Sequence, residues 1–316
     1  MILLVTNERD VTTDYLVLEF RRRNLNYFRL NCEHLPDAKV VFSPSLGGGD
    51  WEFKWDACVL SLAGVKSAYF RRPGAPQLSG RLDPAAERYC IGEWSYFLSS
   101  ALNSLGNRWL NSPLSILAAE DKPRQLRLAI ETGFLVPSTF VSNDIQFAKD
   151  LLSKGEVVAK SLNQGLIEVD GGEKVIFTTS ISSLSVGDED TISLSPVIFQ
   201  EKINKTLDVR VTVVGARTFS AEILSQAHKD TQTDWRRTSV LDVEHAQHVL
   251  PRDIEEKCVN LVAELDLKFG AIDLAVDQGG DYWFLEINPN GQWAWIENRT
   301  GLPITSAIVD ELARNL

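Results

Sequence analysis

The chain has 316 residues, which is room for roughly two or three compact subdomains but not for a long array of independent modules. Hydrophobic residues make up 44% of it and charged residues 24%, as in ordinary globular proteins, and no apolar run is long enough to span a bilayer. The 32 basic and 43 acidic side chains give a net charge of −11, which disfavours binding to the phosphate backbone of nucleic acids.

The start of the chain lacks the basic segment that begins a signal peptide, so we expect a cytoplasmic protein with no membrane and no nucleic-acid partner. The four cysteines are far apart and form neither a CxxC motif nor a cluster with histidine: Cys32, Cys58, Cys90 and Cys258. This spacing disfavours disulfide scaffolds and zinc modules. We expect buried, unreactive thiols at all four positions.

Residues 1–112 have the pattern of a small α/β unit. Ile2–Thr6 is an apolar, strand-like run, residues 10–24 have helical spacing, and Tyr27–Leu30 is a second apolar run. This order favours a parallel strand–helix–strand beginning. The rest of the unit is expected to contain two further strands and a long helix, over residues 57–62, 67–70 and 84–105.

A break at Asn111-Ser112-Pro113 separates this unit from the rest of the chain. The spacing then predicts one helix from Ser115 to Thr132, stopped by Gly133. Beyond it the pattern changes to short strands, over residues 138–141, 157–161, 175–178, 192–203 and 209–214, with helices over residues 144–154 and 251–265. We divide this part into a central subdomain, residues 113–190, and a C-terminal subdomain, residues 191–316.

The clearest chemical pattern is a predicted hairpin near the C-terminal end. Two strand-like runs, Gly270–Val276 and Tyr282–Asn288, are joined by a turn. Because side chains alternate along a strand, Glu286 and Asn288 share one face of the hairpin, where Asp273 can join them. The alternation turns apolar neighbours to the other face: Ile272, Leu274, Val276, Leu285 and Ile287.

Two carboxylates side by side on this hairpin require an explanation. Like charges facing each other in a sheet cost roughly 0.2–1 kcal/mol even when exposed, so a buried pair needs a compensating cation. Oxygen ligands alone suit Mg²⁺ or Mn²⁺. The hairpin by itself leaves a second interpretation open, in which Asp273 and Glu286 are solvated positions on an amphipathic hairpin.

The segment Phe284-Leu285-Glu286-Ile287-Asn288-Pro289-Asn290 resembles the terminal metal motif of the ATP-grasp ligases, with Asp273 at the upstream acidic position. The resemblance extends over residues 112–300. It implies an ATP-grasp fold of the α/β (α+β) class, with an N-terminal βαβ pre-ATP-grasp domain before the central and C-terminal ATP-binding subdomains. It also implies ATP and two Mg²⁺ ions, or Mn²⁺, as cofactors, and as metal ligands Asp273, Glu286 and Asn288.

Four more segments match the family's motifs in the expected order. Ala119–Pro123 and Val157–Lys160 resemble the segments that carry lysines on the nucleotide phosphates. Phe199–Ile203 resembles the hinge that reads adenine, and Asp208–Gly215 the strand that follows it. The nucleotide contacts implied by this resemblance are Lys122, Lys160, Gln200, Glu201, Lys202, Ile203 and Asp208.

The resemblance also implies particular roles. Glu201 is expected to accept from the exocyclic amine of adenine, and backbone groups of Lys202 and Ile203 to read the edge of the ring. Catalysis of phosphoryl transfer is mostly positioning and charge neutralisation. The residues expected to supply positive charge for it are Lys160, Arg210 and Arg236, the last preferred over Arg237. The lid over the phosphates is left unassigned.

Within the family, three segments are most similar to the microviridin-type, or graspetide, peptide macrocyclases: Tyr69–Pro73, Asp234–Arg236 and Asn288–Glu297. This resemblance implies that an Asp or Glu side chain of a ribosomally made precursor peptide becomes an acyl phosphate. It then forms an ester with Thr or Ser, or an amide with Lys, within the same peptide. A leader segment of the precursor peptide is expected to dock on the enzyme.

Two other functions remain open from the sequence. The first is an intermolecular ligase similar to the ribosomal-protein glutamate ligases, which adds an amino acid to a carboxylate of a protein or small molecule. The second is a non-catalytic peptide-binding module that has kept the fold. The acidic residues of the hairpin argue against this module, because a dead site has no reason to keep mutually repelling ligands. A homodimer is also left open.

Overall fold

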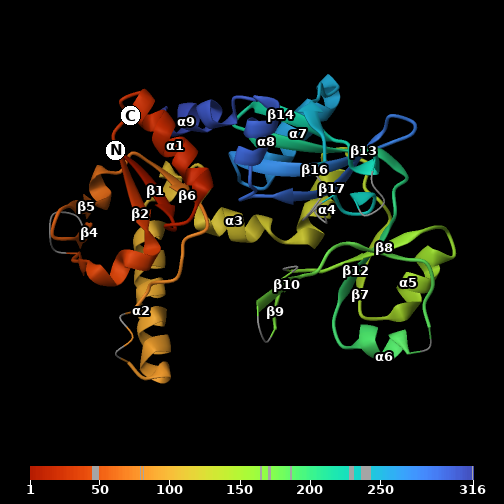
Figure 1. Ribbon diagram of the computed structural model, residues 1–316, viewed down its shortest axis with the longest axis horizontal. Helices are drawn as coiled ribbons and strands as arrows, with labels where there is room; N and C mark the ends of the chain where they lie inside the picture. Colours follow the sequence, from red (N-terminus) through yellow and green to blue (C-terminus); the bar gives the residue numbers. More distant parts are fainter. Residues whose placement is uncertain are drawn as a thin grey trace.

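The computed structural model describes residues 1–44, 50–78, 80, 82–163, 166–169, 172–185, 187–227, 231–235, 243–314 and 316. An N-terminal unit stands beside a larger C-terminal sheet, and a smaller sheet lies below the latter in Figure 1. The predicted α/β class is confirmed, since helices alternate with strands of parallel and antiparallel sheets along the chain. In the described ranges no helix is both long and apolar enough to cross a membrane.

The N-terminal unit is built on the buried strand β1 (Ile2–Thr6), which pairs in parallel with β2 (Tyr27–Asn31) and β6 (Ser67–Phe70). Helix α1 (Val11–Arg22) connects β1 to β2, and the side chain of its N-cap Asp10 accepts from a first-turn amide. The predicted strand–helix–strand beginning is therefore confirmed. Because β1 has neighbours on both sides, the loops after β1 and β6 meet at the carboxyl edge of this sheet.

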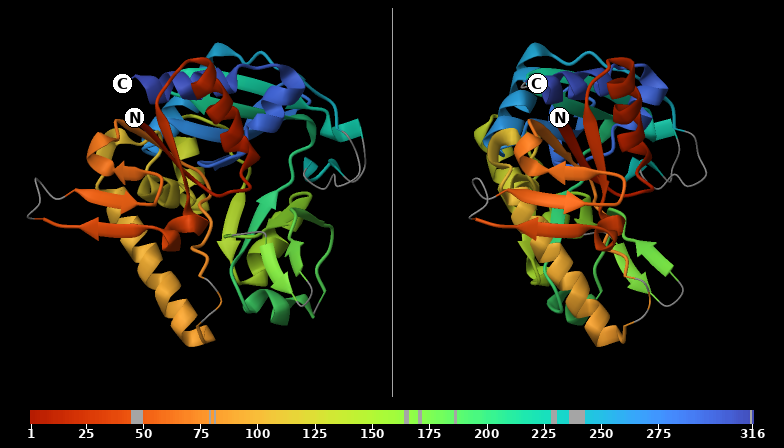
Figure 2. Two further views of the ribbon diagram at one scale, coloured as in Figure 1. Left: turned by 60° about the vertical axis from the view of Figure 1, so that its left-hand side comes forward. Right: turned by 90° about the vertical axis from the view of Figure 1, so that its left-hand side faces the viewer.

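A second, antiparallel sheet of this unit contains β3 (Lys39–Phe42), β4 (Trp51–Lys54) and β5 (Val59–Ser61). The sequence predicted β5 but missed β3 and β4. Helix α2 (Pro84–Asn103) is the predicted long helix. It extends away from the sheets, and its fully buried residues all lie in its C-terminal part (Figure 1; Figure 2).

The single helix predicted from Ser115 to Thr132 is wrong, because the structure has two helices here, α3 (Pro113–Ala119) and α4 (Lys122–Glu131). Asp121 caps α4, its side chain accepting a hydrogen bond from an amide of the first turn. Pro123 explains the break, since proline lacks the N–H that a continuous helix needs and suits a first turn.

The smaller sheet is antiparallel, with the order β11-β8-β12-β7, and is accompanied by the separate hairpin β9–β10 and by two helices. Their bounds are β7 (Thr139–Ser142), α5 (Ile145–Leu152), β8 (Val157–Lys160), β9 (Leu166–Val169), β10 (Gly172–Val175), β11 (Thr179–Ile181), α6 (Asp188–Ser193) and β12 (Val197–Glu201).

Two predicted strands in this region need correction. The strand predicted over residues 175–178 is wrong, because Val175 ends β10 and β11 begins only at Thr179. The strand predicted over residues 192–203 begins at Val197 instead, after α6. Because β12 pairs with β7 and β8, this sheet extends beyond residue 190, and the three-part division of the chain stays a prediction.

The C-terminal sheet has the order β15-β14-β13-β16-β17 and is antiparallel throughout. Helix α7 covers one face, where a large apolar core lies. Helices α8 and α9 cover part of the other face together with α1. The bounds are β13 (Lys205–Val214), β14 (Arg217–Ile223), β15 (His245–Gln247), α7 (Arg252–Glu264), β16 (Phe269–Asp277), β17 (Tyr282–Asn288), α8 (Ala294–Thr300) and α9 (Ile304–Ala313).

The cysteines fit the prediction only in part. Cys258 lies on the apolar face of α7, and burial raises the pKa of its thiol to about 12. Burial likewise raises the pKa of Cys32 to about 12, so both thiols are unreactive. Cys58 is exposed and Cys90 is half-buried, which contradicts the expectation for these two. Both lie outside the apolar cores that the sheets bury.

Candidate active site

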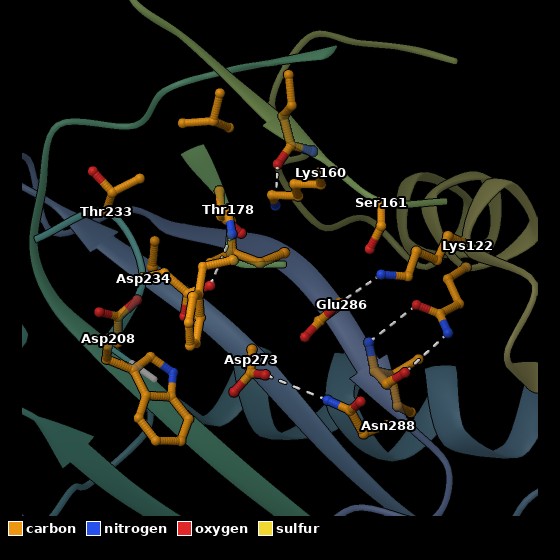
Figure 3. Close-up of a pocket in the computed structure, with 18 of the residues that line it drawn as sticks. Lys122, Lys160, Ser161, Thr178, Asp208, Thr233, Asp234, Asp273, Glu286 and Asn288 are labelled. Carbon is orange, nitrogen blue, oxygen red and sulfur yellow. Dashed lines mark hydrogen bonds and ion pairs between the residues drawn. The ribbon is translucent and has the colours of Figure 1, made fainter. Parts of the chain in front are cut away.

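A cavity of about 900 Å³ lies between the smaller sheet and the open part of the C-terminal sheet (Figure 3). Strands β8 and β12 form one wall, and β13, β16 and β17 form the other. Its size is at the upper end of cavities that bind small molecules and cofactors. Ten of the predicted site residues line this cavity: Lys122, Lys160, Gln200, Glu201, Lys202, Ile203, Asp208, Asp273, Glu286 and Asn288.

The two carboxylates of the hairpin face each other across β16 and β17. Asp273 is the register partner of Glu286, and Ala271 is the partner of Asn288, so the three polar side chains share the pocket face. The side-chain amide of Asn288 donates to Asp273 Oδ2 at 3.4 Å. The predicted grouping of the three side chains is therefore present. The Asn288 amide can turn by half a rotation, so that its oxygen instead of its nitrogen faces a bound cation.

The predicted direction of Leu285 is wrong. The register shifts after Asp273, so that Leu274 pairs with Phe284 and Leu285 is an extra residue in β17. Such a β-bulge interrupts the strict alternation of side chains. Phe284, and not Leu285, is buried in the apolar core, while Leu285 lines the cavity.

Three acidic side chains of the pocket have a cation beside them. Arg210 Nε lies 3.2 Å from Asp273 Oδ1, and Lys122 Nζ lies 3.5 Å from Glu286 Oε2. A third pair, from Lys205 Nζ to Asp208 Oδ1, spans 2.7 Å. Opposite charges at these distances offset part of the cost of removing the carboxylates from water.

The donor set fits magnesium. Asp273 and Glu286 supply carboxylate oxygens and Asn288 an amide oxygen, which are ligands that Mg²⁺ prefers. The described residues contain no group of three His, Cys, Asp or Glu side chains that could hold a metal by themselves. Because Mg²⁺ usually keeps waters and shares phosphate oxygens with a bound nucleotide, two carboxylates and one amide are a sufficient protein contribution.

Lys160 is held in place by a chain of hydrogen bonds across the smaller sheet. Its Nζ donates to Gln200 Oε1 at 2.6 Å, and the Gln200 amide nitrogen donates to Thr139 Oγ1 at 2.8 Å. Gln200 is 2% exposed, so this chain is shielded from water. The lysine therefore reaches the cavity from a fixed position (Figure 3).

The hinge residues lie at the cavity, but several of their backbone groups are already used. The Glu201 amide donates to the Ser138 carbonyl at 2.8 Å, and the Ile203 carbonyl accepts from the Lys205 amide at 2.9 Å. The Lys202 amide donates to the Glu156 carbonyl at 2.8 Å, and the Glu201 carboxylate accepts from the Ser138 amide at 3.3 Å. The Lys202 carbonyl and the Ile203 amide therefore remain as the backbone candidates for reading a base.

Arg210 does not line the cavity itself but lies directly below Asp273, 6% exposed. Its guanidinium carbon is 5.7 Å from the centre of the Trp235 ring, and that ring is 5.2 Å from Trp295. Trp235 lines the cavity, so this stack forms its floor beside Asp273. The predicted catalytic residue Arg236 lies outside the described residues, and so does Arg237.

Asp234 lines the cavity, although no specific role was predicted for it from the sequence. It is 4% exposed and accepts from the backbone amide of Thr178 at 3.1 Å (Figure 3). This bond joins the segment before β11 to the segment after β14, and thus the two walls of the cavity. Only the neighbouring Trp235 and arginines drew attention to this position in the sequence.

Gln125 was missed as a residue of the site. It is 3% exposed, its amide nitrogen donates to the Ile287 carbonyl at 2.9 Å, and its amide oxygen accepts from the Ile287 amide at 3.2 Å. This pair of bonds fixes β17 between the two pocket residues Glu286 and Asn288. A buried polar residue on an amphipathic helix was the one available sign of this role.

Gln125→Leu is expected to destabilise the protein by about 1–3 kcal/mol, because it leaves the Ile287 amide and carbonyl buried without their partner. Urea unfolding measures this. Gln146→Leu is the matched control, since Gln146 is exposed on α5 and the hydrogen bond given for its side chain in the described part of the chain is to Asp150, also exposed. Equal stability of the two variants would contradict the role of Gln125.

No protein-family model matches the chain, and no curated protein matches it at a significant level. Solved structures do match. The chain is similar to the RiPP-associated ATP-grasp ligase of Chryseobacterium gregarium, solved in complex with ADP and a leader and core peptide. The identity is 29%, the match covers 100% of this chain and 97% of that chain, and the TM-score is 0.92.

Two macrocyclases from Microcystis aeruginosa MRC are also similar to the chain. MdnC, bound with the precursor peptide MdnA, is 29% identical with a TM-score of 0.85, and the match covers 100% of both chains. MdnB is 27% identical with a TM-score of 0.80, and the match covers 99% of both chains. The predicted fold and enzyme class are thus confirmed: the chain has the ATP-grasp fold over its whole length and is, by structural homology, an ADP-forming ATP-grasp ligase.

Proposed function

We propose that this ATP-grasp ligase activates an Asp or Glu side chain of a ribosomally made precursor peptide and then closes an ester with Thr or Ser, or an amide with Lys. Support comes from similar structures: the C. gregarium ligase holds ADP with a leader and core peptide, and MdnC holds its precursor peptide. The observation that carries the proposal is the cavity, in which paired carboxylates and an amide lie close to Lys122 of α4, and Lys160 of β8 lines the same cavity.

Within this cavity we assign ATP to the side between the hinge and the acidic strands. Gln200, Glu201, Lys202 and Ile203 would hold the adenine, with Asp208 nearby. Lys122 and Lys160 would contact the phosphates, and Mg²⁺ would be held by Asp273, Glu286 and Asn288. Bound Mg²⁺ would neutralise the charge of the phosphates and polarise the γ-phosphoryl group.

The reaction needs no nucleophile from the protein. A carboxylate oxygen of the peptide attacks the γ-phosphorus, the bond to ADP breaks, and an acyl phosphate forms. A hydroxyl or amine of the same peptide then attacks the acyl carbon, loses its proton, and releases inorganic phosphate. The task of the chain is to align these groups and to place positive charge from Lys160, Arg210 and Arg236 around them.

Mass spectrometry tests the proposal. A candidate precursor peptide, encoded next to this chain and rich in Thr and Glu or Asp, is incubated with the enzyme, ATP and Mg²⁺. We expect the peptide to lose the mass of one water for each bond formed, with one ADP released per bond. Omitting ATP, or adding EDTA, should leave the mass unchanged.

Other outcomes of the same experiment favour the alternatives. An unchanged peptide mass with ADP release that depends on a free amino acid would support the intermolecular carboxylate–amine ligase. Binding of the peptide without ADP release under any condition would support a non-catalytic peptide-binding module. Either result would overturn the macrocyclisation proposal.

A further inference from the structure

Two consecutive arginines at the end of β6 have opposite environments. Arg71 is fully buried, whereas Arg72 is exposed and lines the cavity. The backbone makes this divergence possible, because Arg72 has φ +44°, in the left-handed region that residues other than glycine rarely adopt. Pro73 follows it and further restricts the conformations available to Arg72.

Strain of this kind persists only where the surrounding structure fixes it. Here the Arg72 carbonyl accepts from the side-chain amide of Asn7 at 2.6 Å, and the Arg71 amide donates to the Val5 carbonyl at 2.8 Å. Both contacts come from β1 and the loop after it. The carboxyl edge of the N-terminal sheet therefore holds Arg72 in its unusual conformation.

Arg71 joins this edge to the loop that follows the acidic strand β17. Its Nη1 donates to the carbonyls of Asn290 and Gly291 at 3.0 and 2.9 Å, and its Nε lies 3.6 Å from Asp10. Gly291 allows this loop to lie against β16, because a Cβ there would lie 2.6 Å from the Ala271 Cβ. Arg72 is thereby fixed relative to the pocket wall that carries Glu286 and Asn288.

The charge of Arg72 is only weakly balanced, by the more distant carboxylates of Asp10 and Glu120. Among the described residues no carboxylate lies within ion-pair distance of it, in contrast to Lys122 and Lys205 in the same pocket. Partial burial of the guanidinium, together with the charge of Arg71, lowers the pKa of Arg72 from its usual value. A partly desolvated cation at the edge of a cavity attracts an anionic ligand.

The position of Arg72 separates it from the hinge. On the C-terminal sheet the hinge precedes Lys205, at one end of β13, whereas Arg71 holds Arg72 at Asn290 and Gly291, beyond the other end of β17. The acidic residues lie between these ends, because Arg210, Asp273 and Glu286 are paired in register. Arg72 therefore faces the side of the acidic residues opposite the hinge, where the acceptor of the phosphoryl group would lie.

We propose that Arg72 binds the carboxylate of the substrate through its guanidinium fork and positions it for attack on ATP. This inference rests on the proposed function, because it takes the acceptor to be an Asp or Glu side chain. A planar guanidinium can hold a carboxylate through two parallel hydrogen bonds, which fixes its orientation as well as its place. The N-terminal unit would then supply the substrate side of the site.

A capped glutamate with a single side-chain carboxylate, N-acetyl-glutamic acid α-amide, is the probe. Calorimetric titration into the full chain with saturating ADP and Mg²⁺ is expected to show at least tenfold weaker binding to Arg72→Gln than to the wild type. Arg72→Lys, which keeps the charge but loses the fork, should fall in between. Affinity for ADP should be the same in all variants.

Arg127→Gln is the matched control, because it removes the same charge from an exposed position on α4. It should bind the probe as the wild type does. Unchanged probe binding by Arg72→Gln, or no binding by the wild type, would overturn the inference. Equal weakening of ADP and probe would overturn it as well, since Arg72 would then act on the nucleotide.

The two proposals can fail separately. Probe binding that depends on Arg72, together with a precursor peptide that is never crosslinked, would leave the inference standing and remove the macrocyclisation. Conversely, a peptide that is crosslinked with the same KM by Arg72→Gln and Arg127→Gln would leave the macrocyclisation standing and remove the inference about Arg72. If both proposals hold, Arg72→Gln should raise the KM for the peptide while leaving the KM for ATP unchanged.

Discussion

Replacing Glu286 by glutamine is expected to reduce ADP release by a factor on the order of 10³, because preorganised charges at the reacting phosphoryl group supply most of the catalysis in such a site. Glutamine has nearly the shape of glutamate but carries no charge. The change removes one of the two carboxylates that face each other across β16 and β17, and leaves the amide of Asn288 in place.

The fold should survive this substitution. Glu286 is a half-buried residue at the cavity wall, and Lys122 Nζ, which lies 3.5 Å from its carboxylate, can remain solvated. Thermal unfolding of the metal-free variant should therefore match that of the wild type within a few degrees, whereas the shift in Tm caused by Mg²⁺ and ADP should shrink.

Glu264→Gln provides the comparison for this prediction. Glu264 is exposed at the end of α7, away from the cavity, so its substitution removes an equal charge without touching the site. Turnover at the wild-type rate in Glu286→Gln would remove the metal assignment. A fall of the same size in Glu264→Gln would show that net charge, and not the hairpin, controls the rate.

The hairpin itself illustrates how far the sequence leads. Alternation along two strands was enough to place Asp273, Glu286 and Asn288 on one face, and the register of β16 and β17 bears this out. The bulge at Leu285 could not be predicted, because it depends on how two strands pair and not on either strand alone. The sequence therefore placed the polar residues correctly but assigned Leu285 to the wrong face.

Other parts of the site depend on contacts between distant segments. Gln125 bonds to the backbone of Ile287, and Asp234 bonds to the backbone of Thr178. Nothing near Gln125 or Asp234 in the chain encodes these partners, because a backbone group is the same at every residue. The break before α4, by contrast, had a sign in the sequence, because Pro123 disfavours a continuous helix. The prediction of a single helix followed the apolar spacing around Pro123 instead.

Arg210→Met is expected to lower the free energy of unfolding by about 3–5 kcal/mol, because it removes the guanidinium that lies beside the buried carboxylate of Asp273. Asp273 is 8% exposed and lies 3.2 Å from the Arg210 guanidinium. Methionine keeps an unbranched side chain of similar length but not the cation–π contact with Trp235, so the loss reports on both charge contacts of Arg210. Urea unfolding of the metal-free protein measures it.

The double variant Arg210→Met/Asp273→Asn separates this electrostatic cost from any other effect. Neutralising Asp273 removes the buried carboxylate charge that Arg210 faces, so the double variant should regain most of the lost stability while remaining inactive. Arg127→Met is the surface control, since its ion pair with Glu131 is exposed and worth about 0–1 kcal/mol. No recovery in the double variant would mean that Arg210 stabilises the site through packing.

Recovery without activity would carry a further conclusion. The Arg210–Asp273 pair would then be retained although a neutral pair is nearly as stable, so its charges must serve something other than the fold. In the register of β13, β16 and β17, Arg210 and Glu286 both lie opposite Asp273. Arg210 would thus place its positive charge beside Asp273, next to Glu286, and keep the two carboxylates in position to bind a cation.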